Sequence, residues 1–183
     1  MISANWPFSP KKFPFFYGWV VWGFSTLGIL FSIPGQTMGL AVFTDSFIEV
    51  LGLSRTELSL AYLIGTVGSS LFLARAGRWY DIFGGRTMIT IASVALSLMI
   101  IYVSYVDILS ASLGGSVWLS FTLIMIGYFG VRFFGQGVLT SCSRNVLLLW
   151  FIKKRGLVGG MRNVFVSLGF SIAPLILASL ISF

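Results

Sequence analysis

An all-α membrane protein with about five transmembrane helices is the fold that the sequence predicts. Of its 183 residues, 57% are hydrophobic and only 9% are charged, and the mean hydropathy is +0.97. A soluble domain needs far more polar surface than these few ionisable side chains supply. Five apolar runs are each about 20 residues long, enough for a helix to cross the hydrocarbon core of a bilayer. They cover residues 17–40, 58–76, 87–106, 116–141 and 157–181.

The chain divides into an N-terminal segment, residues 1–16, and one transmembrane unit, residues 17–183. Lys11 and Lys12 precede the first run, as basic residues do in a signal peptide. The run is too long for one, however, and it lacks a small-residue cleavage site, so we expect a retained first span. Pro34 and Pro174 fall within the first and fifth runs, where each frees a backbone carbonyl and can kink the helix.

The basic residues predict the orientation of the chain in the membrane. When the five runs alternate in direction, Arg55 stands alone on one side. The opposite side carries Lys11, Lys12, Arg75, Arg78, Arg86, Arg144, Lys153, Lys154, Arg155 and Arg162. Loops rich in Lys and Arg stay in the cytoplasm. We therefore expect a multi-pass protein of the plasma or inner membrane with a cytoplasmic N-terminal segment.

Several functional classes are excluded by composition. The net charge of +7 does not indicate nucleic-acid binding, because the basic residues lie between apolar runs and not on a polar face. The chain has no histidine, and Cys142 is its only cysteine, which excludes disulfide frameworks, histidine metal sites and histidine-based triads. The spans contain no pair of carboxylates for acid–base catalysis. We expect no enzyme, no cofactor and no metal.

Polar residues inside the spans predict a solute pathway. Gln36 and Asn163 lie on small-residue faces of spans one and five, while Arg132 and Gln136 are one α-helical turn apart in span four. Helix packing accounts for most glycines and serines on such faces. A large polar or charged group in hydrocarbon costs a few kcal/mol unless it meets water or a partner. We expect these four residues to contact a solute or its water, with Arg132 attracting an anion. The structural alternative is that its guanidinium bonds carbonyls of a neighbouring helix.

A charged segment between spans two and three carries a recognisable motif. Residues 77–86, GRWYDIFGGR, have the pattern Gly77-x-x-x-Asp81-x-x-Gly84-x-Arg86 in an expected short cytoplasmic loop. The pattern and its position resemble the signature loop of the major facilitator superfamily. Three further segments resemble the branch of monocarboxylate transporters and oxalate/formate antiporters: FYGWVV (16–21), LGLSRTELS (51–59) and WFIKKRGLVGG (150–160). The resemblance covers residues 15 to about 174.

The resemblance implies secondary transport of a small solute, often an organic anion such as a monocarboxylate, by two six-helix halves that rock about a central site. In the family the signature aspartate lies at a helix end and contacts the opposite half. Gly77, Asp81, Gly84 and Arg86 are therefore expected to form a conformational latch, and Gly84 permits a tight turn. Simple anchoring by positive charges is the alternative.

The sequence departs from the family pattern at three points. Ile82 stands where the family usually has a basic residue, and Arg132-x-x-Gly135-Gln136-Gly137 resembles the fourth-helix arginine motif with its glycines offset by about one position. About five of twelve expected spans are present. The expected fold is thus an incomplete N-terminal half of a major facilitator bundle. Its partners would be a small solute, the lipid bilayer and the missing C-terminal half. The alternative is a short membrane protein that associates with a partner through its helices, without transport.

Overall fold

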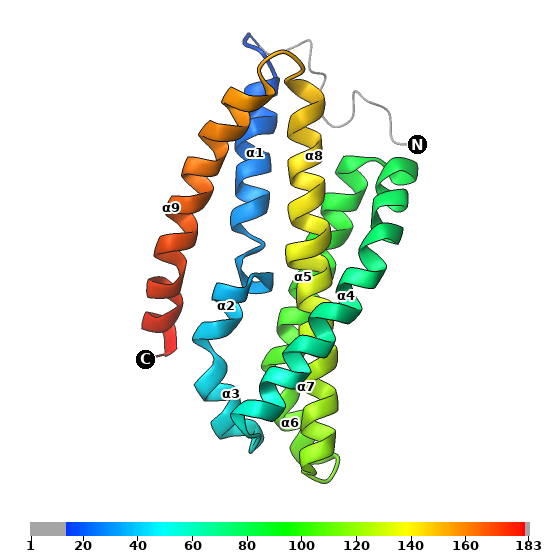
Figure 1. Ribbon diagram of the computed structural model, residues 1–183, viewed down its shortest axis with the longest axis vertical. Helices are drawn as coiled ribbons and strands as arrows, with labels where there is room; N and C mark the ends of the chain where they lie inside the picture. The colour runs from blue at the N-terminus through cyan, green and yellow to red at the C-terminus, as the bar shows by residue number, and fades with distance from the viewer. Residues whose placement is uncertain (1–13, 182–183) are drawn as a thin grey trace.

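The computed structural model describes residues 14–181 as a bundle of helices elongated along one axis (Figure 1). Four helical stretches are long and apolar enough to cross a membrane. They are α4 (Arg55–Phe83), α5 (Gly85–Ser104), the continuous run Val117–Trp150 and α9 (Arg155–Ile181). Residues 14–181 are helical apart from short connections, as predicted, and the four stretches are candidate spans of a multi-pass membrane protein. They coincide with the second to fifth apolar runs, although the fourth continues nine residues further, to Trp150.

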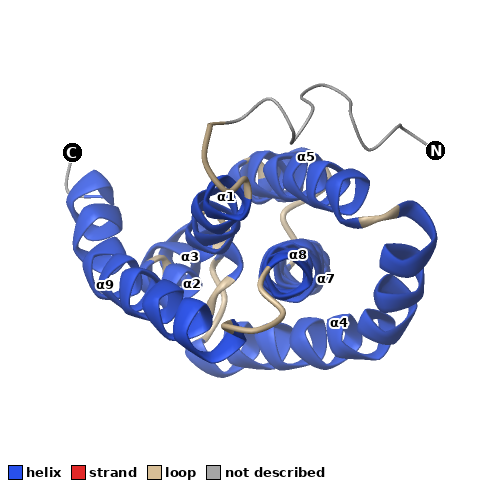
Figure 2. Cartoon of the chain, turned by 90° about the horizontal axis from the view of Figure 1, so that it is seen from above, coloured by secondary structure: helices blue, strands red, loops and turns tan. Residues whose placement is uncertain are grey.

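The run Val117–Trp150 is the central helix of the bundle. It consists of α7 (Val117–Val131), a π-helical segment (Arg132–Leu139) and α8 (Thr140–Trp150). Figure 2 shows it end-on, with α1, α4 and α5 around it. Ile124, Leu139 and Leu147 are completely enclosed along its length. α4, α5 and the first crossing all pack against this helix, which therefore forms the centre of the interior.

The first apolar run does not form one helix. α1 (Gly18–Leu30) has 13 residues and rises only about 20 Å, too little to cross a bilayer alone. The chain then makes a 3₁₀ turn (Ile33–Gly35) and continues as α2 (Thr37–Val42) and α3 (Thr44–Leu51). Figure 1 shows these segments following one another along the long axis. The prediction of an uninterrupted helix over 17–40 is therefore wrong.

The break has a local chemical cause. Pro34 lies in the first turn of the 3₁₀ segment and has no N–H to donate to a preceding carbonyl. The Ser32 hydroxyl donates to the Ile29 carbonyl at 2.6 Å, replacing one bond of the helix ladder. Gln36 adopts an extended conformation, φ −84° and ψ 155°, before α2 begins. Pro174, by contrast, lies inside α9 without ending it.

α9 is the outermost long helix and packs on α1 and α2 (Figures 1 and 2). Trp22 Nε1 donates to the Val158 carbonyl at 3.2 Å, and the Trp22 ring meets Phe165 edge-on at 5.4 Å. Most of the remaining surface of α9 is apolar and exposed, with Leu168 at 56% and Leu175 at 72%. Such a surface requires lipid or another protein segment to cover it.

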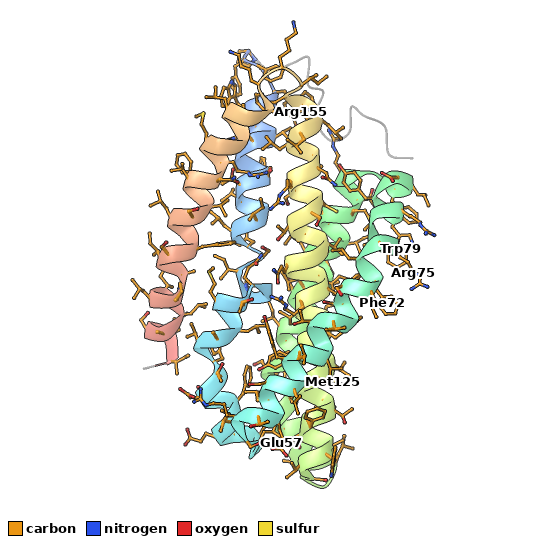
Figure 3. All side chains as sticks on the ribbon, in the orientation of Figure 1. Glu57, Phe72, Arg75, Trp79, Met125 and Arg155 are labelled. Atoms are coloured by element: carbon orange, nitrogen blue, oxygen red, sulfur yellow. The ribbon has the colours of Figure 1, made fainter. Side chains whose placement is uncertain are left out.

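Basic residues predominate at one end of the bundle and acidic residues at the other. α1 begins, α8 turns into α9, and α4 meets α5 at one end, which we call the basic end (Figure 1). Its basic residues are Arg78, Arg86, Lys153, Lys154 and Arg155. The opposite end holds α3, α6 (Val106–Ser112) and the start of α4, with Asp45, Glu49, Glu57 and Asp107. Figure 3 shows Arg155 and Glu57 at opposite ends.

Candidate functional site around Arg132

Arg132 lies in the interior, where α7 gives way to the π-helical segment, and only 8% of it is exposed. Its Nη1 donates to the Gly35 carbonyl at 3.3 Å and to Thr37 Oγ1 at 3.2 Å. Its guanidinium carbon lies 5.1 Å from the centre of the Tyr62 ring, within range of a cation–π contact. The guanidinium therefore does bond a carbonyl of a neighbouring segment, as the structural alternative predicts.

The broken first crossing supplies these acceptors. In an uninterrupted α-helix the Gly35 carbonyl would accept from the N–H four residues later, Gly39, which here bonds Gln36 instead at 3.1 Å. Gly35 also meets the central helix closely, since a Cβ atom there would lie 2.8 Å from the Gly135 Cα. The Gly35 carbonyl that the break leaves without a helical donor thus accepts from Arg132, and the buried guanidinium gains an acceptor.

No carboxylate compensates Arg132 within the described chain. The five acidic residues are Asp45, Glu49, Glu57, Asp81 and Asp107, and none of them hydrogen-bonds or ion-pairs with it. Its partners are all neutral: one carbonyl, one hydroxyl and one aromatic face. A buried cation with only neutral partners is costly and creates a strong local positive potential. An anion placed beside it would be stabilised.

A cleft of about 160 Å³ is lined by two residues that contact Arg132, although Arg132 itself does not line it. Its lining comprises Thr37, Leu40, Ala41, Thr44, Leu58, Ser59, Tyr62 and Tyr128. Thr37 and Tyr62 line the cleft, contact the guanidinium, and share a hydrogen bond of 2.9 Å between their hydroxyls. This volume is below the roughly 300–1,000 Å³ of ordinary ligand pockets, which suits a solute of a few heavy atoms. We call Arg132, Gly35, Thr37, Tyr62 and this cleft the Arg132 site.

Gln36 and Gln136 lie at the same crossing. Gln36 is 9% exposed, and its Nε2 donates to Ser32 Oγ at 3.0 Å and Thr140 Oγ1 at 3.3 Å. Gln136 Oε1 is buried and accepts no hydrogen bond from residues 14–181. The predicted single face for Arg132 and Gln136 assumes an α-helix. The turn of a π-helix is wider than that of an α-helix and only slightly longer than four residues, so the two residues still lie about one turn apart.

Asn163 lies elsewhere. It is an exposed residue of α9, and its Oδ1 accepts from Arg162 Nη2 at 3.0 Å. The structure therefore brings Gln36, Arg132 and Gln136 together and leaves Asn163 outside this group. Ser167 and Ser171, which share the small-residue face of this span with Asn163, are likewise exposed on α9.

The signature segment is helical and not a loop, so that expectation is wrong. α4 continues through Gly77 and Asp81 to Phe83, Gly84 alone lies between the helices with φ 81°, and α5 begins at Gly85. Arg86 lies exposed in the first turn of α5. The polar side chains of residues 77–83 do not interrupt α4, because a helix that reaches the membrane surface can continue with polar residues.

Asp81 is exposed near the end of α4 and forms no hydrogen bond or ion pair with any residue that the structure describes. It lines a cleft of about 380 Å³ at the basic end. The other lining residues are Gly77, Tyr80, Asn145, Leu148, Leu149 and Arg155. Asp81 does not cap α5, whose N-cap residue is Gly84. Its carboxylate is therefore available to a partner at this surface.

Thr37 and Tyr62 belong to the Arg132 site, and Thr140 bonds Gln36 at the same crossing, yet none of the three was predicted from the sequence. Each falls within a predicted span or at its edge, where a hydroxyl or a tyrosine has no distinctive spacing. Only the arrangement of α2, α4 and the central helix brings Thr37 and Tyr62 to Arg132. Arg132 itself was detectable because it is a cation inside an apolar run.

No protein-family model, curated protein or solved structure matches this chain.

Proposed function

We propose that this chain takes part in secondary transport of a small organic anion across a membrane, with Arg132 as the attracting charge. The observation that carries this proposal is a buried guanidinium with only neutral partners, two of which, Thr37 and Tyr62, line a cleft. A carboxylate entering the cleft would replace the missing counter-charge. Charge-assisted hydrogen bonds to guanidinium are among the strongest that such a solute can form.

The donors at the site suit a carboxylate. Arg132 uses only Nη1 in hydrogen bonds to the rest of the described chain, so Nε and Nη2 are available for a second partner. Thr37 and Tyr62 line the same cleft; one of their two hydroxyl protons is used in the hydrogen bond between them, and the other can donate to a carboxylate oxygen. The apolar side chains Leu40, Ala41 and Leu58 would cover a short hydrocarbon portion.

The resemblance to major facilitator transporters supplies the wider mechanism of this proposal. A second helical half would complete the wall of the site, and the two halves would expose it alternately to the two sides of the membrane. Asp81, exposed at the basic end, would contact that half as part of the latch with Gly77, Gly84 and Arg86. The basic end would face the cytoplasm.

A second candidate is association with a partner protein without transport. The exposed apolar surface of α9 favours it, because residues such as Leu168 and Leu175 would suit a helix–helix contact as well as lipid. This candidate assigns no role to the uncompensated charge of Arg132, and we therefore rank it second.

Uptake of labelled small carboxylates into proteoliposomes tests the proposal. The protein expressed from its complete reading frame is compared with Arg132→Gln and with Arg75→Gln as a matched control. Arg75 points away from the bundle, over the Phe72 ring at 5.3 Å (Figure 3). We expect Arg132→Gln to reduce uptake at least about tenfold, the effect of losing roughly 1.4 kcal/mol of binding, and Arg75→Gln to retain it. Equal uptake by both variants would refute the assignment, and no uptake of any carboxylate by the unmodified protein would favour the association role.

A further inference from the structure

One face of α4 carries a row of exposed side chains that changes from apolar to basic along the helix. Successive members are four or three residues apart, the spacing that keeps side chains on one face of an α-helix. The row lies on one of the four candidate spans, and the described chain leaves it uncovered. We call it the outer face of α4, and it consists of Leu60, Ile64, Val67, Leu71, Arg75 and Arg78.

The length of α4 places the two arginines at a boundary of the membrane. Arg55 begins the helix and Arg75 follows twenty residues later, a rise of about 30 Å, which equals the thickness of the hydrocarbon core. With Arg55 at one boundary of the core, Arg75 lies at the other, and Arg78 reaches the headgroup layer. From Leu60 to Leu71 the row rises about 16 Å, roughly the depth of the acyl chains of one leaflet.

An aromatic contact orders the Arg75 side chain at this boundary. Its guanidinium carbon lies 5.3 Å from the centre of the Phe72 ring, within range of a cation–π contact. The Phe72 ring in turn meets Phe129 of α7 edge-on at 5.8 Å, which fixes it against the central helix. Figure 3 shows Phe72, Arg75 and Trp79 on the same outer side of α4. The Arg75 guanidinium forms no hydrogen bond or ion pair within residues 14–181, so its N–H groups are available to an anion.

No acidic side chain compensates these arginines within the described residues. The ion pair found there joins Arg55 to Asp45, at the opposite end of α4. Asp81 follows Arg78 by three residues, but it lines the cleft shared with α8 and pairs with no cation of the described chain. Two uncompensated positive charges therefore lie on adjacent turns, directly above an exposed apolar row, and this end of the row attracts anions.

We propose that the outer face of α4 binds an anionic phospholipid. The headgroup phosphate accepts from Arg75 and Arg78, and an acyl chain lies along the four apolar residues below them. Such a lipid fits both halves of the row. A free anion would leave the apolar half uncovered, and a packed helix without a carboxylate would bury two unpaired charges. Trp79 lies beside the headgroup, the level at which tryptophan is enriched in membrane proteins.

This surface is separate from the Arg132 site. Tyr62 belongs to that site and lies on the same helix, but it precedes Arg75 by thirteen residues, about 20 Å along the axis. The inference therefore does not rest on the proposed transport function, and loss of Arg75 should affect the lipid and not the solute.

Native mass spectrometry of the protein expressed from its complete reading frame tests the proposal, with added phosphatidylglycerol as the ligand and phosphatidylcholine as the neutral comparison. We expect preferential retention of phosphatidylglycerol. Arg75→Gln and Arg78→Gln should each weaken it about fivefold, the equivalent of roughly 1 kcal/mol per arginine at an anionic surface, and the double variant about twenty-fivefold. Both side chains are exposed, so their substitution leaves the helix packing intact.

Lys153→Gln is the matched control, because it removes an exposed cation at the same basic end but away from α4. Retention that depends on Arg75 and Arg78 but not on Lys153 supports the proposal. An equal loss in all three single variants would show attraction by net charge alone, and equal retention of the two lipids would show binding by the apolar row alone; either result overturns it. Unchanged retention in the double variant would also overturn it, as expected if another protein segment covers this face.

Discussion

Gly35 and Gly135 bring the backbones of the first crossing and the central helix into direct contact. A Cβ atom at Gly35 would lie 2.8 Å from the Gly135 Cα, and one at Gly135 would lie 2.9 Å from the Gly35 Cα. Both glycines lie at irregular points, one ending the 3₁₀ turn and the other inside the π-helical segment. This contact sets the position of the Gly35 carbonyl that accepts from Arg132.

Gly35→Ala is expected to destabilise the protein by about 1–3 kcal/mol, the usual cost of overpacking a close contact. The measurement is the free energy of unfolding in detergent. Gly23→Ala is the matched control, because Gly23 lies in α1 with no atom within 4 Å of its added Cβ, and it should be neutral or slightly stabilising. Equal stabilities for the two variants would show that the close crossing does not exist.

Gly77 and Gly84 belong to the same motif but should respond oppositely to alanine. Gly84 has φ 81° and ψ 159°, a conformation almost confined to glycine, so Gly84→Ala should cost about 1–3 kcal/mol. Gly77 is helical with open space around it, so Gly77→Ala should stabilise α4 by up to about 1 kcal/mol. Thermal unfolding measures both changes. Destabilisation by Gly77→Ala of the same size would indicate a loop there instead of a helix.

α4 begins with a reciprocal cap that should contribute measurably to stability. Ser54 Oγ accepts from the Glu57 N–H at 3.2 Å, and the Ser54 N–H donates to Glu57 Oε2 at 2.8 Å. Ser54→Ala is expected to cost about 1 kcal/mol. Ser70→Ala, which removes an exposed hydroxyl on the same helix, should change stability by less than about 0.5 kcal/mol. Indistinguishable unfolding of the two variants would argue against the cap.

The charge difference between the two ends predicts a labelling pattern in cells. In a Cys142→Ala background, where the native buried thiol is removed, Lys153→Cys lies at the basic end and Glu49→Cys at the opposite end. A membrane-impermeant maleimide should label Glu49→Cys in intact cells and Lys153→Cys only after permeabilisation. The reverse pattern would place the basic end outside the cytoplasm.

Composition and periodicity predicted the long helices because hydrophobic length alone determines whether a helix can span a bilayer. The same criterion failed for residues 17–40, since it does not register Pro34 and the Gly35–Gly135 contact that end α1 early. It also predicted a loop at 77–86 from the polar residues there, although Gly77 to Phe83 continue α4.

The Arg132 site, too, was predicted only in part from the sequence. A cation within an apolar run identifies Arg132 without knowledge of its neighbours. Thr37 and Tyr62 required the three-dimensional arrangement, since they lie 95 and 70 positions from Arg132. Arg162 was assigned to the basic side by its place in the sequence, but its α9 packs on α1 and buries the side chain, while the neighbouring Asn163 remains exposed.

The central claim, that Arg132 lacks a counter-charge which a solute anion supplies, is tested most directly by placing a carboxylate beside it. Thr37 contacts the guanidinium at 3.2 Å, so Thr37→Asp would supply an internal partner, and Thr37→Asn is the neutral variant of the same shape. Binding of the carboxylate selected by the uptake panel is measured by calorimetry for both variants. The account predicts at least about tenfold weaker binding for Thr37→Asp than for Thr37→Asn, because the internal carboxylate competes with the solute. Equal affinities for the two variants would contradict it.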